Sequence, residues 1–81
     1  MKNELLENIE ELHTTPMGVE RIRRNLELGG DVKDVVAFCR QKILNPTAFI
    51  TRQGKNWYVK IDGFIITVNA YSFTIITTHK E

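Results

Sequence analysis

The 81-residue sequence contains a single cysteine, Cys39, and none of the common motifs for metal binding or nucleophilic catalysis. One cysteine excludes an intrachain disulfide and fits a reducing compartment. Cys39 falls on an apolar helical stripe, where we expect a buried thiol. The sequence has no glycine-rich phosphate loop, no paired-cysteine or His-x-x-x-His spacing and no nucleophile elbow. We therefore expect neither a metal site nor a cofactor.

No apolar run reaches the length of a membrane span, and the acidic, amphipathic start of the chain differs from a signal peptide. These absences predict a cytoplasmic protein without a membrane partner. Hydrophobic residues make up 42% of the chain and charged residues 26%, as in an ordered globular protein. The length predicts one small domain, residues 1–81.

Charge is unevenly distributed, although the formal net charge is only +1. Residues 1–20 contain five acidic residues and one basic residue, whereas residues 21–81 contain ten basic and five acidic residues. This asymmetry favours either an anionic partner for the basic part or self-association of opposite patches.

The second half of the chain predicts a meander of antiparallel strands. Asp62-Gly63 is a strong hairpin signal, because a type I′ turn needs positive φ at both central positions. With that turn, the facing pairs are Ile61–Phe64, Val59–Ile66 and Trp57–Val68. Tips at Gln53-Gly54 and Ala70-Tyr71 add the pairs Ile50–Trp57, Val68–Phe73, Ile66–Ile75 and Phe64–Thr77.

This register predicts two different sheet faces, because side chains alternate along a strand. The apolar face consists of Ile50, Trp57, Val59, Ile61, Phe64, Ile66, Val68, Phe73 and Ile75. The polar face has Tyr58, Thr67 and Thr74 at its centre and Lys60 at its edge. Asn56, Asn69 and Ser72 lie at one end of it. Either this is an ordinary solvated face, or it is a hydrogen-bonding platform for a ligand.

Apolar periodicity and capping residues predict three helices before the strands. The helices cover about 3–13, 16–28 and 32–44, with Thr15 and Asp31 as N-caps of the last two. The strands cover about 47–52, 56–61, 64–69 and 72–79. The predicted fold is α+β, with three N-terminal helices packed on one face of a four-stranded antiparallel β-meander.

The candidate catalytic residues are His13, Arg21, Arg24, Thr77 and His79, and the candidate ligand-binding residues are Asn56, Tyr58, Lys60, Thr67, Asn69 and Thr74. Metal-independent RNA cleavage needs a proton acceptor, a proton donor and cations for the phosphate, and the first set contains such groups. Helical spacing puts Arg21 and Arg24 on one face, where they could hold a phosphate or simply be solvated. Strand parity puts Thr77 and His79 on the apolar side, away from Tyr58, unless a bulge intervenes.

Several segments resemble a family of small bacterial proteins that share a domain of unknown function. They are Leu12-His13-Thr14-Thr15, Gly18-Val19-Glu20-Arg21-Ile22, Asn56-Trp57-Tyr58, Ile66-Thr67-Val68-Asn69-Ala70-Tyr71-Ser72 and Thr74-Ile75-Ile76-Thr77. The resemblance covers nearly the whole chain and implies no activity. More distantly, the order of His13, Arg21, Arg24 and Ile76-Thr77-Thr78-His79 is similar to the superfamily of barnase-like, colicin-like and RelE-like ribonuclease toxins. That likeness implies helices before an antiparallel sheet.

Three functions follow as hypotheses. We favour a non-catalytic binder, such as a bacterial or phage accessory protein, whose polar sheet face takes a nucleotide, nucleic acid or protein partner. The first alternative is a toxin-like endoribonuclease that uses the histidines and arginines. The second is a structural homodimer that pairs through the last strand, Phe73–Thr78, which would be an exposed edge.

Overall fold

The computed structural model describes residues 3–81. The elements, in chain order, are α1 (Glu4–Glu7), the 3₁₀ turn η1 (Ile9–Glu11), α2 (Pro16–Asn25), α3 (Val35–Leu44), β1 (Phe49–Gln53), β2 (Asn56–Ile61), β3 (Phe64–Asn69) and β4 (Ile75–Lys80). None of these helices is long and apolar enough to cross a bilayer.

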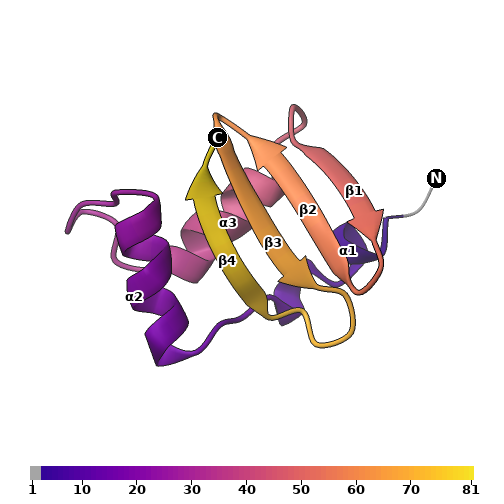
Figure 1. The fold of residues 1–81 in the computed structure, drawn as a ribbon, viewed down its shortest axis with the longest axis horizontal. Coiled ribbons are helices and arrows are strands. Elements are labelled where there is room, and N and C mark those ends of the chain that lie inside the picture. Colours follow the sequence, from indigo (N-terminus) through magenta and orange to yellow (C-terminus); the bar gives the residue numbers. More distant parts are fainter. Residues whose placement is uncertain (1–2) are drawn as a thin grey trace.

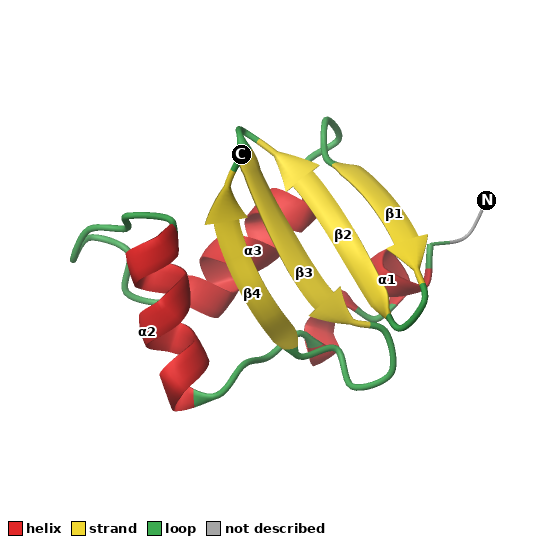
Figure 2. Ribbon diagram, in the orientation of Figure 1, coloured by secondary structure: helices red, strands yellow, loops and turns green. Residues whose placement is uncertain are grey.

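The four strands form one antiparallel sheet in the order β1-β2-β3-β4. Helices α1 and α3 lie behind this sheet in Figure 1, whereas α2 stands beside β4. The opposite face of the sheet, which is turned toward the viewer in Figure 2, has no helix over it. The predicted α+β class and antiparallel meander are therefore confirmed. The prediction that all three helices cover one face is too simple, because α2 flanks an edge.

The β2–β3 hairpin has the predicted register. Ile61 faces Phe64, Val59 faces Ile66 and Trp57 faces Val68. The turn uses positive φ at Asp62 (+51°) and Gly63 (+79°), as the type I′ interpretation requires.

The first hairpin turns one residue later than predicted. Gln53 faces Asn56, so Gly54-Lys55 is the tip, and Gly54 supplies a φ of +59°. Ile50 consequently faces Val59 instead of Trp57. The register differs by two residues, which keeps every side chain on its predicted face.

The predicted register of the last hairpin is wrong. Val68 faces Ile75 instead of Phe73, and Thr67 faces Thr77, so Ile76 is an extra residue in a β-bulge. The bulge reverses the parity of the rest of β4. The predicted register, which puts Thr77 opposite Phe64, places the next residue, Thr78, on the polar face. In the structure Thr78 is 0% exposed and faces Ile66 in the core.

Two layers of apolar side chains meet behind the sheet. The helical layer contributes Leu5, Leu12, Ile22, Leu26, Val35, Cys39 and Ile43, and the sheet layer contributes Trp57, Val59, Ile61, Ile66, Val68, Ala70 and Ile75. The predicted core face is thereby confirmed, with Ile50, Phe64 and Phe73 packed at its margin.

The helices are shorter than predicted, and α3 begins three residues later, at Val35. The first helical segment breaks at Asn8 into α1 and η1, and α2 ends at Asn25. The N-cap of α2 is Thr15, as predicted, whose hydroxyl accepts from Gly18 N at 3.0 Å. The N-cap of α3 is Asp34, not Asp31, because its carboxylate accepts from Ala37 N at 3.0 Å.

The outer edge of β4 is occupied by earlier parts of the chain. Ile75 N donates to His13 O (2.8 Å), Thr14 Oγ1 donates to Ile75 O (3.2 Å), and Asn25 Nδ2 donates to Thr78 O (2.8 Å). β4 is the last strand of the sheet, as expected, but its outer edge is partly covered, so homodimer pairing through it would displace these contacts. Lys80 at the end of β4 also pairs with Glu27 after α2, and this hydrogen bond and charge lower the pKa of Glu27.

Candidate functional site

The uncovered sheet face carries three rows of side chains that cross the strands. An amide row contains Gln53, Asn56 and Asn69; a hydroxyl row contains Thr51, Tyr58, Thr67 and Thr77; a mixed row contains Phe49, Lys60, Ile65 and His79. We refer to these eleven residues as the open face. The rows run from purely polar at the β1–β2 turn to aromatic and basic at the opposite end.

Tyr58 stands at the centre of the open face. It is half-buried and faces Thr51 on one side and Thr67 on the other. Asn56 Nδ2 donates to Tyr58 Oη at 3.3 Å, which orients the ring. Thr67 is only 5% exposed and lies between Tyr58 and Thr77 in the row. Of the hydroxyl row, a visiting molecule would therefore meet Tyr58 and Thr77 before Thr67.

The β4 bulge brings Thr77 and His79 onto the open face. Thr77 takes the place beside Thr67 that was predicted for Thr74, and His79 faces Ile65. The expectation that parity hides both residues on the apolar side is corrected by the extra residue Ile76. This correction adds an imidazole to the row that already holds Lys60.

Thr74 instead contacts His13, which lies 61 residues away in the sequence. The two residues form a parallel bridge, and Thr74 Oγ1 is 3.1 Å from His13 Nε2. His13 Nδ1 lies 2.8 Å from Glu11 O. Because a carbonyl can only accept, Nδ1 carries the proton in the neutral ring, and Thr74 then donates to Nε2. The result is a hydroxyl–imidazole pair with an oriented ring.

Asn69 organises the loop that carries this pair. Its Oδ1 accepts from the backbone N–H groups of Tyr71 and Ser72, each at 2.9 Å. Ser72 Oγ lies 2.8 Å from Thr74 Oγ1, which links the loop to His13. Phe73 adopts a φ of +58°, a strained value for a bulky residue, and its carbonyl accepts from His13 N at 3.2 Å. Asn69 therefore has a structural role at its side-chain oxygen.

The predicted catalytic residues do not gather in one place. His13 lies at the start of β4 and His79 near its end. Five residues separate Thr74 from His79, which corresponds to roughly 15 Å along a strand. An acid and a base this far apart cannot both reach one scissile bond.

The two candidate arginines lie on α2, beside the sheet. Arg21 Nη2 contacts Met17 Sδ at 3.6 Å, and Arg21 precedes Asn25 by one helical turn. Asn25 reaches the backbone of β4, so Arg21 lies on the stripe of α2 that borders this strand. Arg24 is exposed, three residues further along.

Charge is segregated between the sheet and the segments around it. Within the described strands, Arg52, Lys60 and Lys80 are the charged residues, and there is no aspartate or glutamate. By contrast, α1 and η1 contain glutamates. The unequal distribution seen in the sequence thus becomes a basic sheet bordered by acidic helical turns.

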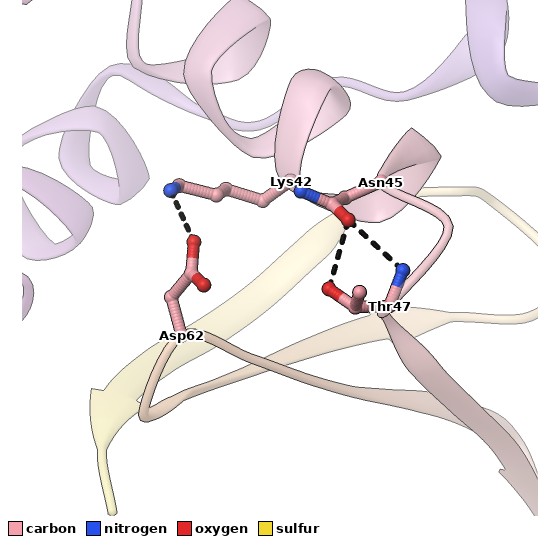
Figure 3. Close-up of polar contacts among 4 residues, drawn as sticks. All are labelled: Lys42, Asn45, Thr47 and Asp62. Carbon is pink, nitrogen blue, oxygen red and sulfur yellow. Dashed lines mark hydrogen bonds and ion pairs between the residues drawn. The ribbon is translucent and has the colours of Figure 1, made fainter.

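The helix side of the molecule offers a different surface. A shallow hollow of about 590 Å³ runs along α3, between Val32 and Asn45. Lys42 there lies 5.3 Å from the Phe38 ring centre and pairs with Asp62 at 2.5 Å. Figure 3 shows the Lys42 and Asp62 side chains pointing toward each other. Asn45 in the same figure accepts from the amide and hydroxyl of Thr47. Asp34, Lys42 and Asn45 are thus engaged in local structure, and the hollow shares no residue with the open face.

Residues 3–81 contain no group of three His, Cys, Asp or Glu side chains that could hold a metal ion. Cys39 is 0% exposed, and burial raises the pKa of its thiol to about 12. A protonated, inaccessible thiol is a poor nucleophile.

Sequence analysis missed one group at the end of the sheet. Arg52 faces Trp57 and lies 5.4 Å from that ring and 5.7 Å from the ring of Tyr71. Strand alternation offered a signal for this group. It puts Arg52 on the apolar face, where a charged side chain requires specific partners.

A family model described as "Protein of unknown function (DUF3781)" matches residues 6–79. No curated protein and no solved structure matches the chain.

Proposed function

Because this chain belongs to the DUF3781 family, whose function is unknown, we infer its role from its own surfaces, and we propose that it binds single-stranded RNA on the open face without cleaving it. The observation that carries the proposal is the uncovered, carboxylate-free sheet with aromatic and basic side chains in adjacent rows.

Electrostatics favour an anionic ligand on this face. Lys60 is exposed and makes no salt bridge within residues 3–81, so its ammonium is available to a phosphate. Arg21 lies on α2 beside β4, and His79 lies two strands from Lys60. No aspartate or glutamate of the described strands opposes a phosphate backbone along the sheet.

Ring stacking and hydroxyl groups favour a single strand over a duplex. Bases exposed in single strands stack on aromatic side chains that stand on open sheets. Tyr58 is central and Phe49 is 63% exposed at the β1 edge, so the face offers two rings. The hydroxyl row can also bond to 2′-hydroxyl groups, which distinguish RNA from DNA.

The separation of His13 from His79 supports binding over cleavage. General acid–base cleavage places both groups around one phosphate, and this pair spans most of β4. His13 is moreover engaged with Thr74 and Glu11, which gives it a structural role in joining the N-terminal segment to the sheet.

Fluorescence anisotropy with a labelled oligoribonucleotide tests the proposal, with Tyr58→Leu and Tyr58→Phe as a matched pair. Tyr58→Leu removes the ring and should weaken binding by about 1–3 kcal/mol, the worth of one stacked base. Tyr58→Phe keeps the ring and should bind within about threefold of the wild-type protein, since only one hydrogen bond is lost. Equal affinities for both variants would contradict stacking on Tyr58.

A second pair of variants tests the charge. Lys60→Ala should lower the slope of log affinity against log salt by about 1, as expected for the loss of one phosphate contact. Lys33→Ala, in the hollow beside α3, removes the same charge from the other side and should leave the slope unchanged. A DNA strand of the same sequence should bind more weakly. Absence of RNA binding at low salt would overturn the proposal.

The same samples report on the ribonuclease alternative. We expect the RNA to remain intact after prolonged incubation at high protein concentration. Cleavage that His13→Ala abolishes would overturn the non-catalytic assignment and favour the endoribonuclease.

A further inference from the structure

Arg52 is held between two aromatic rings at the end of the sheet. Its guanidinium carbon lies 5.4 Å from the Trp57 ring centre and 5.7 Å from that of Tyr71. Its Nε donates to Gly54 O at 2.9 Å. Trp57 is 8% exposed and Tyr71 is 72% exposed, so one ring belongs to the core and the other to the surface. The guanidinium is therefore fixed where solvent reaches it.

Two hairpins combine to build this corner. Ala70 N, in the β3–β4 loop, donates to Lys55 O, in the β1–β2 turn, at 2.6 Å. This bond joins the loop that carries Tyr71 to the turn that follows Arg52. Lys55 is exposed at the same turn and makes no salt bridge within the described residues. A second cation thus follows Arg52 by three residues in the same hairpin.

The remaining donors of Arg52 fit a phosphate. Two ring contacts and the bond to Gly54 use the faces and Nε of the guanidinium, whereas neither Nη makes a hydrogen bond to a described residue. A planar guanidinium that is already oriented binds phosphate through two parallel N–H···O bonds with little further loss of entropy. A role only in covering Trp57 would not require the second ring or the lysine in the same hairpin.

We propose that Arg52, clamped by Trp57 and Tyr71 in the hairpin that also carries Lys55, is a phosphate-binding corner that takes a backbone phosphate where an RNA strand leaves the open face past the β1–β2 turn. Alternation points Arg52 and Trp57 to the opposite side of the sheet from their chain neighbours Gln53 and Asn56, and the corner and the amide row share the end of the sheet at the β1–β2 turn. An RNA strand that runs along the open face and past this turn can therefore reach Arg52. This inference rests on the proposed function, because the rest of the RNA strand must lie on the open face.

The dependence of affinity on RNA length distinguishes binding at the corner from binding on the open face. We would measure anisotropy with oligouridines from about four to about twelve nucleotides, the range of site sizes for single-strand binders. Arg52→Lys keeps the positive charge and the aliphatic stem but loses the fork. It should weaken the longest ligand about tenfold and leave the shortest unchanged. Arg23→Lys, whose arginine bonds to Gly29 O away from the sheet, is the matched control and should bind both normally.

Thermal melts would first verify that Arg52→Lys is folded. Tyr71→Ser provides a second variant, since it removes the exposed ring and leaves Arg52 in place. Tyr71→Ser should show the same length-dependent weakening. Wild-type affinity of both variants for every length would overturn the corner, and so would equal weakening for all lengths, although either result leaves RNA binding on the open face intact.

Inorganic pyrophosphate separates failure of the corner from failure of the proposed function. In ¹⁵N–¹H spectra, pyrophosphate should shift the Tyr71 amide saturably in the wild-type protein and not in Arg52→Lys. That shift without any RNA binding would overturn the proposed function and leave the phosphate corner standing. No shift, together with wild-type RNA binding by Arg52→Lys, would overturn the corner alone.

Discussion

Two adjacent residues of β3 test which side of the sheet is buried. Ile66 is 0% exposed and faces Val59, whereas Ile65 is half-buried on the open face and faces Lys60. The substitutions Ile66→Thr and Ile65→Thr make the same chemical change one residue apart. Threonine keeps the β-branch, so strand propensity changes equally little in both.

The expected difference follows from burial. At position 66 the substitution replaces two buried carbon groups with a hydroxyl. Lost apolar burial amounts to about 1.6 kcal/mol at about 0.8 kcal/mol per group. Burying the hydroxyl costs about 1–3 kcal/mol more unless it finds a partner. We therefore expect Ile66→Thr to lower the free energy of unfolding by about 3 kcal/mol and Ile65→Thr by less than about 1 kcal/mol.

Urea denaturation followed by Trp57 fluorescence and far-UV circular dichroism measures both values. For a protein of this length, each kcal/mol shifts the melting temperature by about 4–8 °C, so the two variants should melt more than about 8 °C apart. Equal destabilisation, or a larger loss for Ile65→Thr, would refute the assignment of the two faces.

Further substitutions test the turn, the β4 edge and the buried thiol. Gly63→Ala forces a side chain into a φ of +79° and should cost about 1 kcal/mol or more, whereas Gly30→Ala, where an added Cβ meets nothing within 4 Å, should stay within about 0.5 kcal/mol. Asn25→Ala removes the donor to Thr78 O and should lower the free energy of unfolding by about 1 kcal/mol in denaturant titrations; no change would argue against that bond. Because burial raises the pKa of Cys39 from 9.0 to about 12, the unfolded chain ionises first. Stability should therefore fall more steeply between pH 9 and 12 in the wild-type protein than in Cys39→Ala, and parallel pH profiles would contradict this.

Local patterns were sufficient to predict the centre of the sheet. Asp62-Gly63 specified a turn with two positive φ angles, and alternation then assigned Val59 and Ile66 to the core. At the first hairpin the tip is Gly54-Lys55 instead of the predicted Gln53-Gly54, and both tips leave the same residues inward. The error in register therefore had no consequence for the faces.

The register of β4 depends on contacts that no local pattern contains. His13 pairs with Thr74 across 61 residues, and Asn69 folds the intervening loop through its side chain. These contacts delay β4 until Ile75, and the bulge then turns Thr77 outward. In the sequence, Ile75-Ile76 and Thr77-Thr78 are repeated pairs, so hydrophobic alternation could not decide between the two parities.

The candidate site, like the sheet, contains one part that the sequence predicts and one part that it does not. Tyr58, Lys60, Asn56 and Thr67 were placed together from alternation alone, because β2 and β3 have the predicted register. Arg52 was missed, since its partners are a ring across the strand and a ring from another hairpin. Contacts between loops produce no periodic pattern in the sequence, unlike the alternation of side chains along a strand.

The most direct test of the open face as the working surface is an amide chemical-shift titration with a single-stranded oligoribonucleotide. We expect saturable shifts that are largest at Tyr58, Lys60 and Thr77, with Ala37 and Gln41 of α3 unmoved. Shifts confined to the α3 side, with the three sheet residues unchanged, would contradict the assignment of RNA binding to this sheet.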